Sequence, residues 1–166
     1  MAEHTGFEEF YSGTRHRLVT YLYAMTGDRA EAQDAAQEAY VRAWQRWSTV
    51  STYDNPEAWL RNVASRLCMN HWRKARNRVA AYLRHGTGPD VDAPSENTVA
   101  LIAALKRLPV ADRQVITMYH LMDLSVAEVA AQTGLPVNTV KTRLSRGRRA
   151  LAGLLDTDAS EEYTHA

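Results

Sequence analysis

Positively charged side chains gather in two stretches of the sequence. The first stretch lies between Glu57 and Asp90, contains no acid, and carries Arg61, Arg66, Arg73, Lys74, Arg76, Arg78 and Arg84. The second stretch follows Glu128 and carries Lys141, Arg143, Arg146, Arg148 and Arg149 before the next acid, Asp156. Guanidinium and ammonium groups neutralise phosphates. Two such clusters on a chain whose net charge is only +1 therefore predict two contacts with nucleic acid.

The first cluster also contains groups that could recognise bases. Asparagine amides can donate to and accept from base edges, and basic side chains bind the backbone. His71 and Trp72 are flat rings, and stacking on a ring is worth about 1 to 3 kcal/mol per base once strands separate. A core position is an equally good interpretation of Trp72. The predicted contacts are Arg61, Asn62, Arg66, Asn70, Trp72, Arg73, Lys74, Arg76 and Arg78.

The second cluster belongs to a helix-turn-helix pattern. Ser125 and Glu128 form a capping box, Gly134 ends that helix, and Asn138 or a neighbour is expected to cap the next one. Its buried side is expected to hold Val140, Leu144 and Leu151. A polar, basic second helix of this kind enters a major groove, although a helical hairpin with a solvated basic face is the alternative. The predicted DNA contacts are Val137, Asn138, Thr139, Lys141, Thr142, Arg143, Ser145, Arg146, Arg148 and Arg149.

An acidic and polar patch is expected near the N-terminus, because acids outnumber bases over residues 1–57. Residues three and four apart are neighbours on a helix, so this spacing forms one patch for a basic partner surface. An ordinary solvated face is the alternative. The patch consists of Asp34, Gln37, Glu38 and Arg42.

Three helices are expected to carry the N-terminal patches. Apolar residues recur at helical steps over residues 7–26 before Gly27, and Asp28 with Glu31 starts a second helix. The apolar face of the second helix should comprise Ala36, Tyr40, Ala43, Trp44 and Trp47. A loop over 48–53 precedes the Asn55-Pro56 start of a third helix. The buried residues of the third helix should be Trp59, Val63 and Leu67.

The predicted fold class is all-α, with two small helical domains joined by a flexible linker. Glycine, proline and aspartate interrupt the helical pattern from about residue 82 to residue 97, and the periodicity then resumes through Ile102, Leu105 and Ile116. We predict a first domain over 1–80, a linker over 81–97, a second domain over 98–155 and a disordered tail over 156–166.

Other functional classes find little support in the sequence. Cys68 is the single cysteine, so no internal disulfide is possible and the cytoplasm is the simplest location. Cys68 and His71 lack a second ligand pair, which argues against a metal site. We expect no cofactor, no catalytic residue and no membrane insertion, because phosphate loops, nucleophile motifs, a signal peptide and long apolar stretches are all missing.

The sequence resembles the extracytoplasmic-function (ECF) sigma factors of the sigma-70 family, which guide bacterial RNA polymerase to promoters. The C-terminal part of the resemblance rests on LP at 108–109, DRQV at 112–115, LSVAEVA at 124–130 and VNTVKTRLSRGR at 137–148. The N-terminal part rests on AQDAAQEAY at 32–40, RAW at 42–44 and PEAWLRNVA at 56–64. Residues 48–54 fall where the family's base-capturing loop should lie, but they show no specific match.

The resemblance implies that the two domains have different roles. The first domain would be the sigma region 2 helical bundle, which grips the polymerase clamp and opens the minus-10 element with the first basic cluster. The second would be the sigma region 4 helix-turn-helix, which reads the minus-35 element and faces the polymerase flap. The implied partners are core RNA polymerase, double-stranded and melted promoter DNA, and an anti-sigma factor. The implied polymerase contacts are Asp34, Gln37, Glu38, Arg42 and Trp44.

Two alternatives stay open at this point. One is a helix-turn-helix regulator that binds an operator and uses its N-terminal helices to dimerise or to sense a ligand. The other is an enzyme with an accessory DNA-binding domain. A regulator would need only the C-terminal basic helix, so the basic cluster at 61–84 favours the sigma factor.

Overall fold

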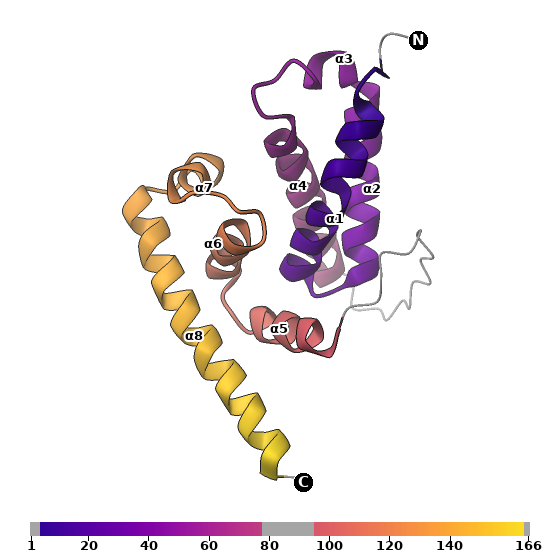
Figure 1. The fold of residues 1–166 in the computed structure, drawn as a ribbon. Helices are drawn as coiled ribbons and strands as arrows, with labels where there is room; N and C mark the ends of the chain where they lie inside the picture. Colours follow the sequence, from indigo (N-terminus) through magenta and orange to yellow (C-terminus); the bar gives the residue numbers. More distant parts are fainter. Residues whose placement is uncertain (1–3, 78–94, 165–166) are drawn as a thin grey trace. The chain divides into compact units, whose positions relative to one another are not determined.

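The computed structural model describes residues 4–77 and 95–164, with the side chains of 72–77 and 158–164 left out of the description. The described residues contain helices and no strand, which confirms the predicted all-α class. The chain divides into two compact units, Met1–Val91 and Asp92–Ala166. Figure 1 traces the helices of each unit in chain order.

The first unit contains α1 (Phe7–Thr26), α2 (Arg29–Gln45), α3 (Trp47–Val50) and α4 (Pro56–Asn77). Helices α1 and α2 pack side by side, and α4 packs against both of them (Figure 1). Small residues of α2 let the neighbouring helices approach closely. The core of this unit includes Leu18, Tyr21, Leu22, Ala32, Ala35, Ala39, Ala43, Leu60 and Ala64.

Local signals set the ends of these helices as predicted. Gly27 has a left-handed φ of 67° and ends α1 by donating its N–H to the Tyr23 carbonyl oxygen. The Asp28 carboxylate accepts from the N–H of Glu31 at 3.0 Å and starts α2. The Asn55 side chain accepts from the N–H of Ala58 at 2.9 Å at the start of α4.

Several details of this unit differ from the predictions. Residues 47–50 form the short helix α3, so the predicted loop is confined to the residues after it. Trp59 and Val63 are only half-buried, because α4 is rotated so that Leu60 and Ala64 face the core. Trp44, which we predicted on the apolar face of α2, is 44% exposed.

The second unit contains α5 (Glu96–Lys106), α6 (Val110–His120), α7 (Val126–Thr133) and α8 (Val137–Thr164). Arg113 of α6 is buried and donates to the carbonyl oxygens of Lys106 and Leu108, at 3.0 and 3.2 Å. These bonds place a cation at the C-terminal end of α5, where the helix dipole is negative. The core consists of Ile102, Leu105, Leu108, Val115, Ile116, Met118, Val129, Val140 and Leu144.

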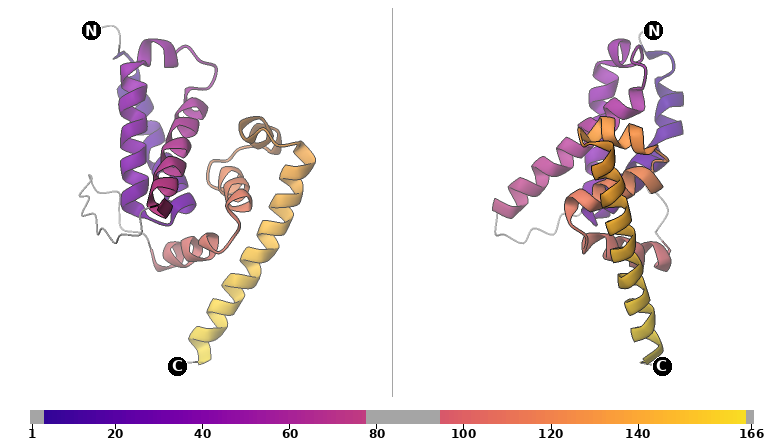
Figure 2. Two further views of the ribbon diagram at one scale, coloured as in Figure 1. Left: turned by 180° about the vertical axis from the view of Figure 1, so that it is seen from behind. Right: turned by 90° about the vertical axis from the view of Figure 1, so that its left-hand side faces the viewer.

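Both ends of this unit differ from the prediction. The Ser95 hydroxyl caps α5, which begins at Glu96, so the helix starts inside the segment predicted as linker. Residues 81–94, the rest of that segment, lie outside the described residues. Helix α8 continues to Thr164 (Figure 2), so its backbone extends into the tail that we predict from residue 156. The part of α8 after Arg149 contains no proline, and its one glycine, Gly153, is tolerated inside the helix.

Candidate functional site

The α7–turn–α8 segment has the helix-turn-helix geometry that the sequence predicts. The Ser125 hydroxyl accepts from the N–H of Glu128 at 3.1 Å, and the Glu128 carboxylate accepts from the N–H of Ser125 at 2.7 Å. This reciprocal capping box fixes the start of α7. Gly134, with a φ of 72°, ends α7 and turns the chain into α8. The expected cap was Asn138 or a neighbour; helix α8 begins at Val137, so Asn138 itself lies in its first turn.

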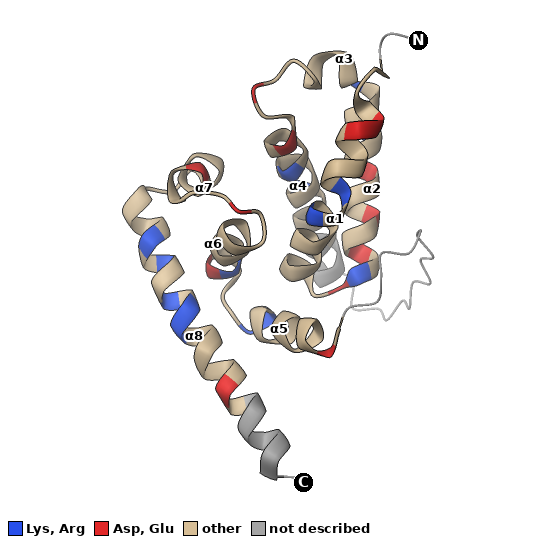
Figure 3. Ribbon diagram, in the orientation of Figure 1, with Lys and Arg blue, Asp and Glu red and all other residues tan. Residues whose placement is uncertain are grey.

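One side of α8 carries polar and basic side chains that face solvent. Figure 3 shows the basic positions spread over successive turns of this helix. A shallow hollow on this surface is lined by Lys141, Thr142, Ser145, Arg146 and Arg149. Hydroxyl, ammonium and guanidinium groups along one helix face can reach phosphates and base edges together. Besides Arg146, the exposed members of this polar side are Lys141, Thr142, Ser145 and Arg149.

Two arginines of α8 are instead bonded to α6. Arg146 donates from Nε and Nη2 to the two carboxylate oxygens of Asp112, at 2.9 and 2.6 Å. Arg148 donates from Nε to Nε2 of His120 at 3.1 Å and lies over the ring of Tyr119. Burial and the neighbouring Arg148 lower the pKa of His120, which keeps its imidazole neutral and able to accept this bond.

The remaining predicted residues of α8 vary in exposure. Val137 and Asn138 are exposed, whereas Thr139 and Arg143 are half-buried. Val140 and Leu144 are buried as predicted, and Leu151 is half-buried. The predicted DNA-contact set is therefore not one continuous face, because part of it packs on the unit itself.

Arg61 departs from its predicted role as a phosphate contact. Its side chain is only 2% exposed and lies 3.7 Å from the Glu57 carboxylate, one turn earlier on α4. Glu57 also accepts from Arg17 of α1 at 2.9 Å. A buried guanidinium cannot reach a DNA backbone, so the prediction for Arg61 is wrong. Its neighbours Leu60 and Ala64 put this part of α4 against the core.

Other predicted residues of α4 keep accessible positions. Arg66 and Asn70 are exposed, and Asn62 is half-buried. Four further predicted residues lie on the last turns of α4, where only the backbone is described: Trp72, Arg73, Lys74 and Arg76. Arg78 lies outside the described residues.

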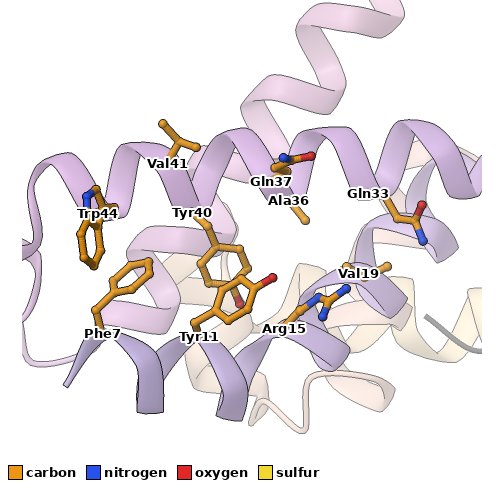
Figure 4. Close-up of a pocket in the computed structure, with 10 residues that line it drawn as sticks. All are labelled: Phe7, Tyr11, Arg15, Val19, Gln33, Ala36, Gln37, Tyr40, Val41 and Trp44. Carbon is orange, nitrogen blue, oxygen red and sulfur yellow. The ribbon is translucent and has the colours of Figure 1, made fainter. Parts of the chain in front are cut away.

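A groove of about 350 Å³ runs between α1 and α2. Figure 4 shows the rings of Phe7 and Trp44 at one end of it, Tyr11 and Tyr40 in the middle, and Gln33 at the other end. The Trp44 ring stacks on the His4 ring, with 3.6 Å between the ring centroids, and packs edge-on against Phe7 at a centroid distance of 4.9 Å. A tryptophan that is held by other rings yet remains exposed can bury its surface against a partner.

The predicted polar patch lies on α2 beside this groove. Asp34, Gln37 and Arg42 are exposed, and Gln37 also lines the groove. Glu38 is half-buried and accepts from Arg42 at 2.6 Å, one helical turn away. Figure 3 shows the acidic positions along α2. The structure thus brings the predicted acidic patch and an apolar groove together on one helix.

A metal centre finds no support in the described part of the chain. No group of three or more histidine, cysteine, aspartate or glutamate side chains there could hold an ion. Burial raises the pKa of the Cys68 thiol to about 12, which leaves it protonated and a poor ligand at neutral pH. Among the same described residues, no helix is long and apolar enough to cross a membrane.

Comparison with known proteins assigns both units to one family. Residues 10–78 match the family described as Sigma-70 region 2, and residues 98–151 match Sigma-70, region 4. The chain is 37% identical over 146 residues to the ECF RNA polymerase sigma factor SigL of Mycobacterium tuberculosis, with 82% of each chain covered. The chain belongs to the ECF sigma factors. As a sigma factor it directs transcription initiation, and the operator-binding regulator is not favoured.

Further relatives agree with this assignment. The sigma factor is 34% identical over 163 residues to BldN of Streptomyces coelicolor, covering 90% of this chain and 59% of that one. Its fold is similar to that of RpoE from Bartonella quintana, solved in complex with the anti-sigma factor NepR. That likeness has a TM-score of 0.71 at 21% identity and covers 91% of this chain and 99% of the other.

The sequence did not reveal two features of these sites in this sigma factor. Phe7 and Tyr11 form the α1 wall of the groove, and their spacing of four residues on an amphipathic helix was the available signal. Asp112 lies 34 residues before its partner Arg146, and nothing in the local pattern links the two.

Proposed function

We propose that this sigma factor binds core RNA polymerase mainly through α2 and holds promoter DNA with α4 and α8. The observation that carries the proposal is the solvent-facing polar side of α8, which is the second helix of the helix-turn-helix. In this assignment α8 recognises the minus-35 element, with Lys141, Thr142, Ser145 and Arg149 in the major groove. The corresponding domains are residues 1–80 and 98–155.

The minus-10 element is assigned to α4. Arg66 and Asn70 are exposed on the helix, and their side chains can contact backbone phosphates and separated bases. The residues that follow on α4 extend the same basic stretch: Trp72, Arg73, Lys74 and Arg76. Arg61 is excluded from this assignment by its burial.

The polymerase surface is assigned to the acidic patch and the groove of α2. An apolar hollow with an exposed tryptophan at one end and carboxylates beside it suits a surface that carries apolar and basic groups. The clamp would meet the first unit and the flap the second. An anti-sigma factor is a further proposed partner, because RpoE, which is similar in fold, was solved in complex with the anti-sigma factor NepR. The chain itself would catalyse no reaction and would act in the cytoplasm, where its polymerase is.

In vitro transcription tests this function. Core RNA polymerase of Mycobacterium tuberculosis would be incubated with the purified chain and a library of templates with random upstream sequences. We expect transcripts that depend on the chain and that start downstream of two spaced sequence elements. The proposal is contradicted if the chain neither binds core enzyme nor changes the set of transcripts.

The double variant Lys141→Ala/Arg149→Ala tests the assignment of α8. Loss of two phosphate-binding cations should weaken binding of the selected promoter by about 30-fold. It should also lower the slope of the logarithm of the binding constant against the logarithm of the salt concentration by about 2. Binding of the polymerase should be retained. The measurement is titration of labelled duplex with the reconstituted complex at several salt concentrations. Lys106→Ala/Arg107→Ala is the matched control, because it removes two exposed charges at the C-terminal end of α5 in the same unit. Equal losses in both double variants would contradict the assignment.

A further inference from the structure

Asp112 is a buried carboxylate in a position to orient one arginine of the recognition helix. It lies in the first turn of α6, and its side chain is 3% exposed. Both of its oxygens accept from Arg146 of α8, at 2.9 and 2.6 Å. A two-point bond of this kind fixes the plane of the guanidinium as well as its position.

Arg146 is nevertheless open to solvent. Its side chain is 59% exposed, and it lines the same surface hollow as Lys141, Ser145 and Arg149. The bonds to Asp112 use Nε and Nη2, so the two hydrogens of Nη1 point away from the carboxylate. The guanidinium can therefore bind Asp112 with one edge and a second acceptor with the other.

The packing of α6 against α8 keeps this pair in place. Gly147 follows Arg146 and lies against Ile116; a Cβ at Gly147 would lie 2.8 Å from Cγ1 of Ile116 and 3.9 Å from Cβ of Asp112. The short side chain of Asp112 can reach Arg146 because the two helices approach so closely here. The bond therefore joins two rigid helices and does not rest on a mobile loop.

We propose that Asp112 is a positioning residue, which holds the Arg146 guanidinium in one orientation toward DNA and thereby increases the base-pair preference of α8. The inference rests on the proposed minus-35 role of α8. An arginine that is already immobilised loses less conformational freedom on binding and can contact only acceptors in the right place. Asp112 would thus act through Arg146 and touch no DNA itself.

The proposal and its main electrostatic alternative predict opposite effects on DNA binding when the Asp112 charge is removed. If Asp112 were only an acid near DNA, its removal would reduce repulsion and tighten binding to every duplex. If it orients Arg146, its removal should weaken binding to the preferred duplex and leave binding to other duplexes unchanged. A purely structural role would instead lower stability and weaken both.

The experiment uses the full chain bound to core RNA polymerase of Mycobacterium tuberculosis. A duplex recovered from a random-sequence pool by the wild-type complex is compared with a shuffled duplex of the same composition. Asp112→Asn should weaken binding to the recovered duplex about tenfold and leave the shuffled duplex within about twofold. Arg146→Ala and Arg146→Ala/Asp112→Asn should bind the recovered duplex equally, because Asp112 acts through Arg146.

Controls separate orientation from charge and from folding. Asp123→Asn removes the same charge from an exposed position of the same unit, where a φ of 55° suits asparagine, and it should bind like the wild type or more tightly. Asp112→Glu keeps the charge but moves the carboxylate by one methylene, so it should also weaken only the recovered duplex. Thermal unfolding of each variant reports its folding.

The inference is overturned if Asp112→Asn or a folded Asp112→Glu binds the recovered duplex as tightly as the wild type. It is also overturned if Asp112→Asn weakens the Arg146→Ala variant as much as it weakens the wild type. If Asp112→Asn does not fold, the result for Asp112→Glu decides alone. Failure of the wild-type complex to recover any preferred duplex would overturn the proposed function and this inference together.

Discussion

Arg61→Ala should lower the free energy of unfolding of the first unit by about 3 kcal/mol, because it removes a buried side chain and one cation of an ion-pair network. The network joins Arg61 to Glu57 at 3.7 Å and Glu57 to Arg17 at 2.9 Å. Glu57 keeps Arg17 as a partner in the variant, so we expect a loss at the lower end of the range for broken buried pairs. Arg61→Met should lose much less, since it restores most of the packing volume without the charge.

Urea unfolding followed by tryptophan fluorescence measures this effect. All four tryptophans belong to the first unit, so the signal does not depend on the second. Arg66→Ala is the matched control: it removes an exposed arginine from the same helix and should change stability by no more than about 0.5 kcal/mol. An Arg61→Ala chain of unchanged stability that binds promoter DNA more weakly would show that Arg61 contacts DNA after all.

Arg61 also shows that a cluster of basic residues in the sequence does not reveal which of them are buried. The charge pattern predicts one solvent-facing cluster after Glu57, yet α4 buries the face that contains Leu60, Ala64 and Cys68. Arg61 lies at helical spacing from Ala64 and Cys68, and four residues after Glu57. This spacing was visible in the sequence, but choosing between a buried ion pair and a phosphate contact requires knowing the rotation of α4 against α1 and α2.

Local interactions explain why other features were predicted well. Gly27, Asn55, Ser125 and Gly134 end or begin helices through bonds to residues at most four positions away. Such bonds depend on the nearby sequence alone, so capping patterns identify them. The Asp112–Arg146 bond spans 34 residues and exists only because α6 and α8 pack together. The same reason explains why the basic residues of α8 could be predicted as a group, but those that bond to α6 could not be told from the others.

The groove between α1 and α2 could not be predicted from the sequence for the same reason, because it depends on how the two helices pack. The pattern of apolar residues put Trp44 on the buried face, and the family resemblance put it on the polymerase surface. In the structure the Trp44 ring packs on His4 and Phe7, and the residue is still 44% exposed. A side chain of this kind is fixed by its own domain and available to another protein.

Trp44→Ala should therefore weaken binding of core RNA polymerase by about 30-fold, equivalent to about 2 kcal/mol, as expected for a tryptophan near the centre of an interface. The variant should still fold, because Trp44 is already 44% exposed in the wild type. The measurement is titration of fluorescently labelled chain with core enzyme, and Met69→Ala, which shortens another exposed apolar residue of the same unit, should bind like the wild type. If Trp44→Ala binds core enzyme as tightly as Met69→Ala, the α1–α2 groove is not the polymerase surface, and the acidic patch of α2 would have to account for binding without it.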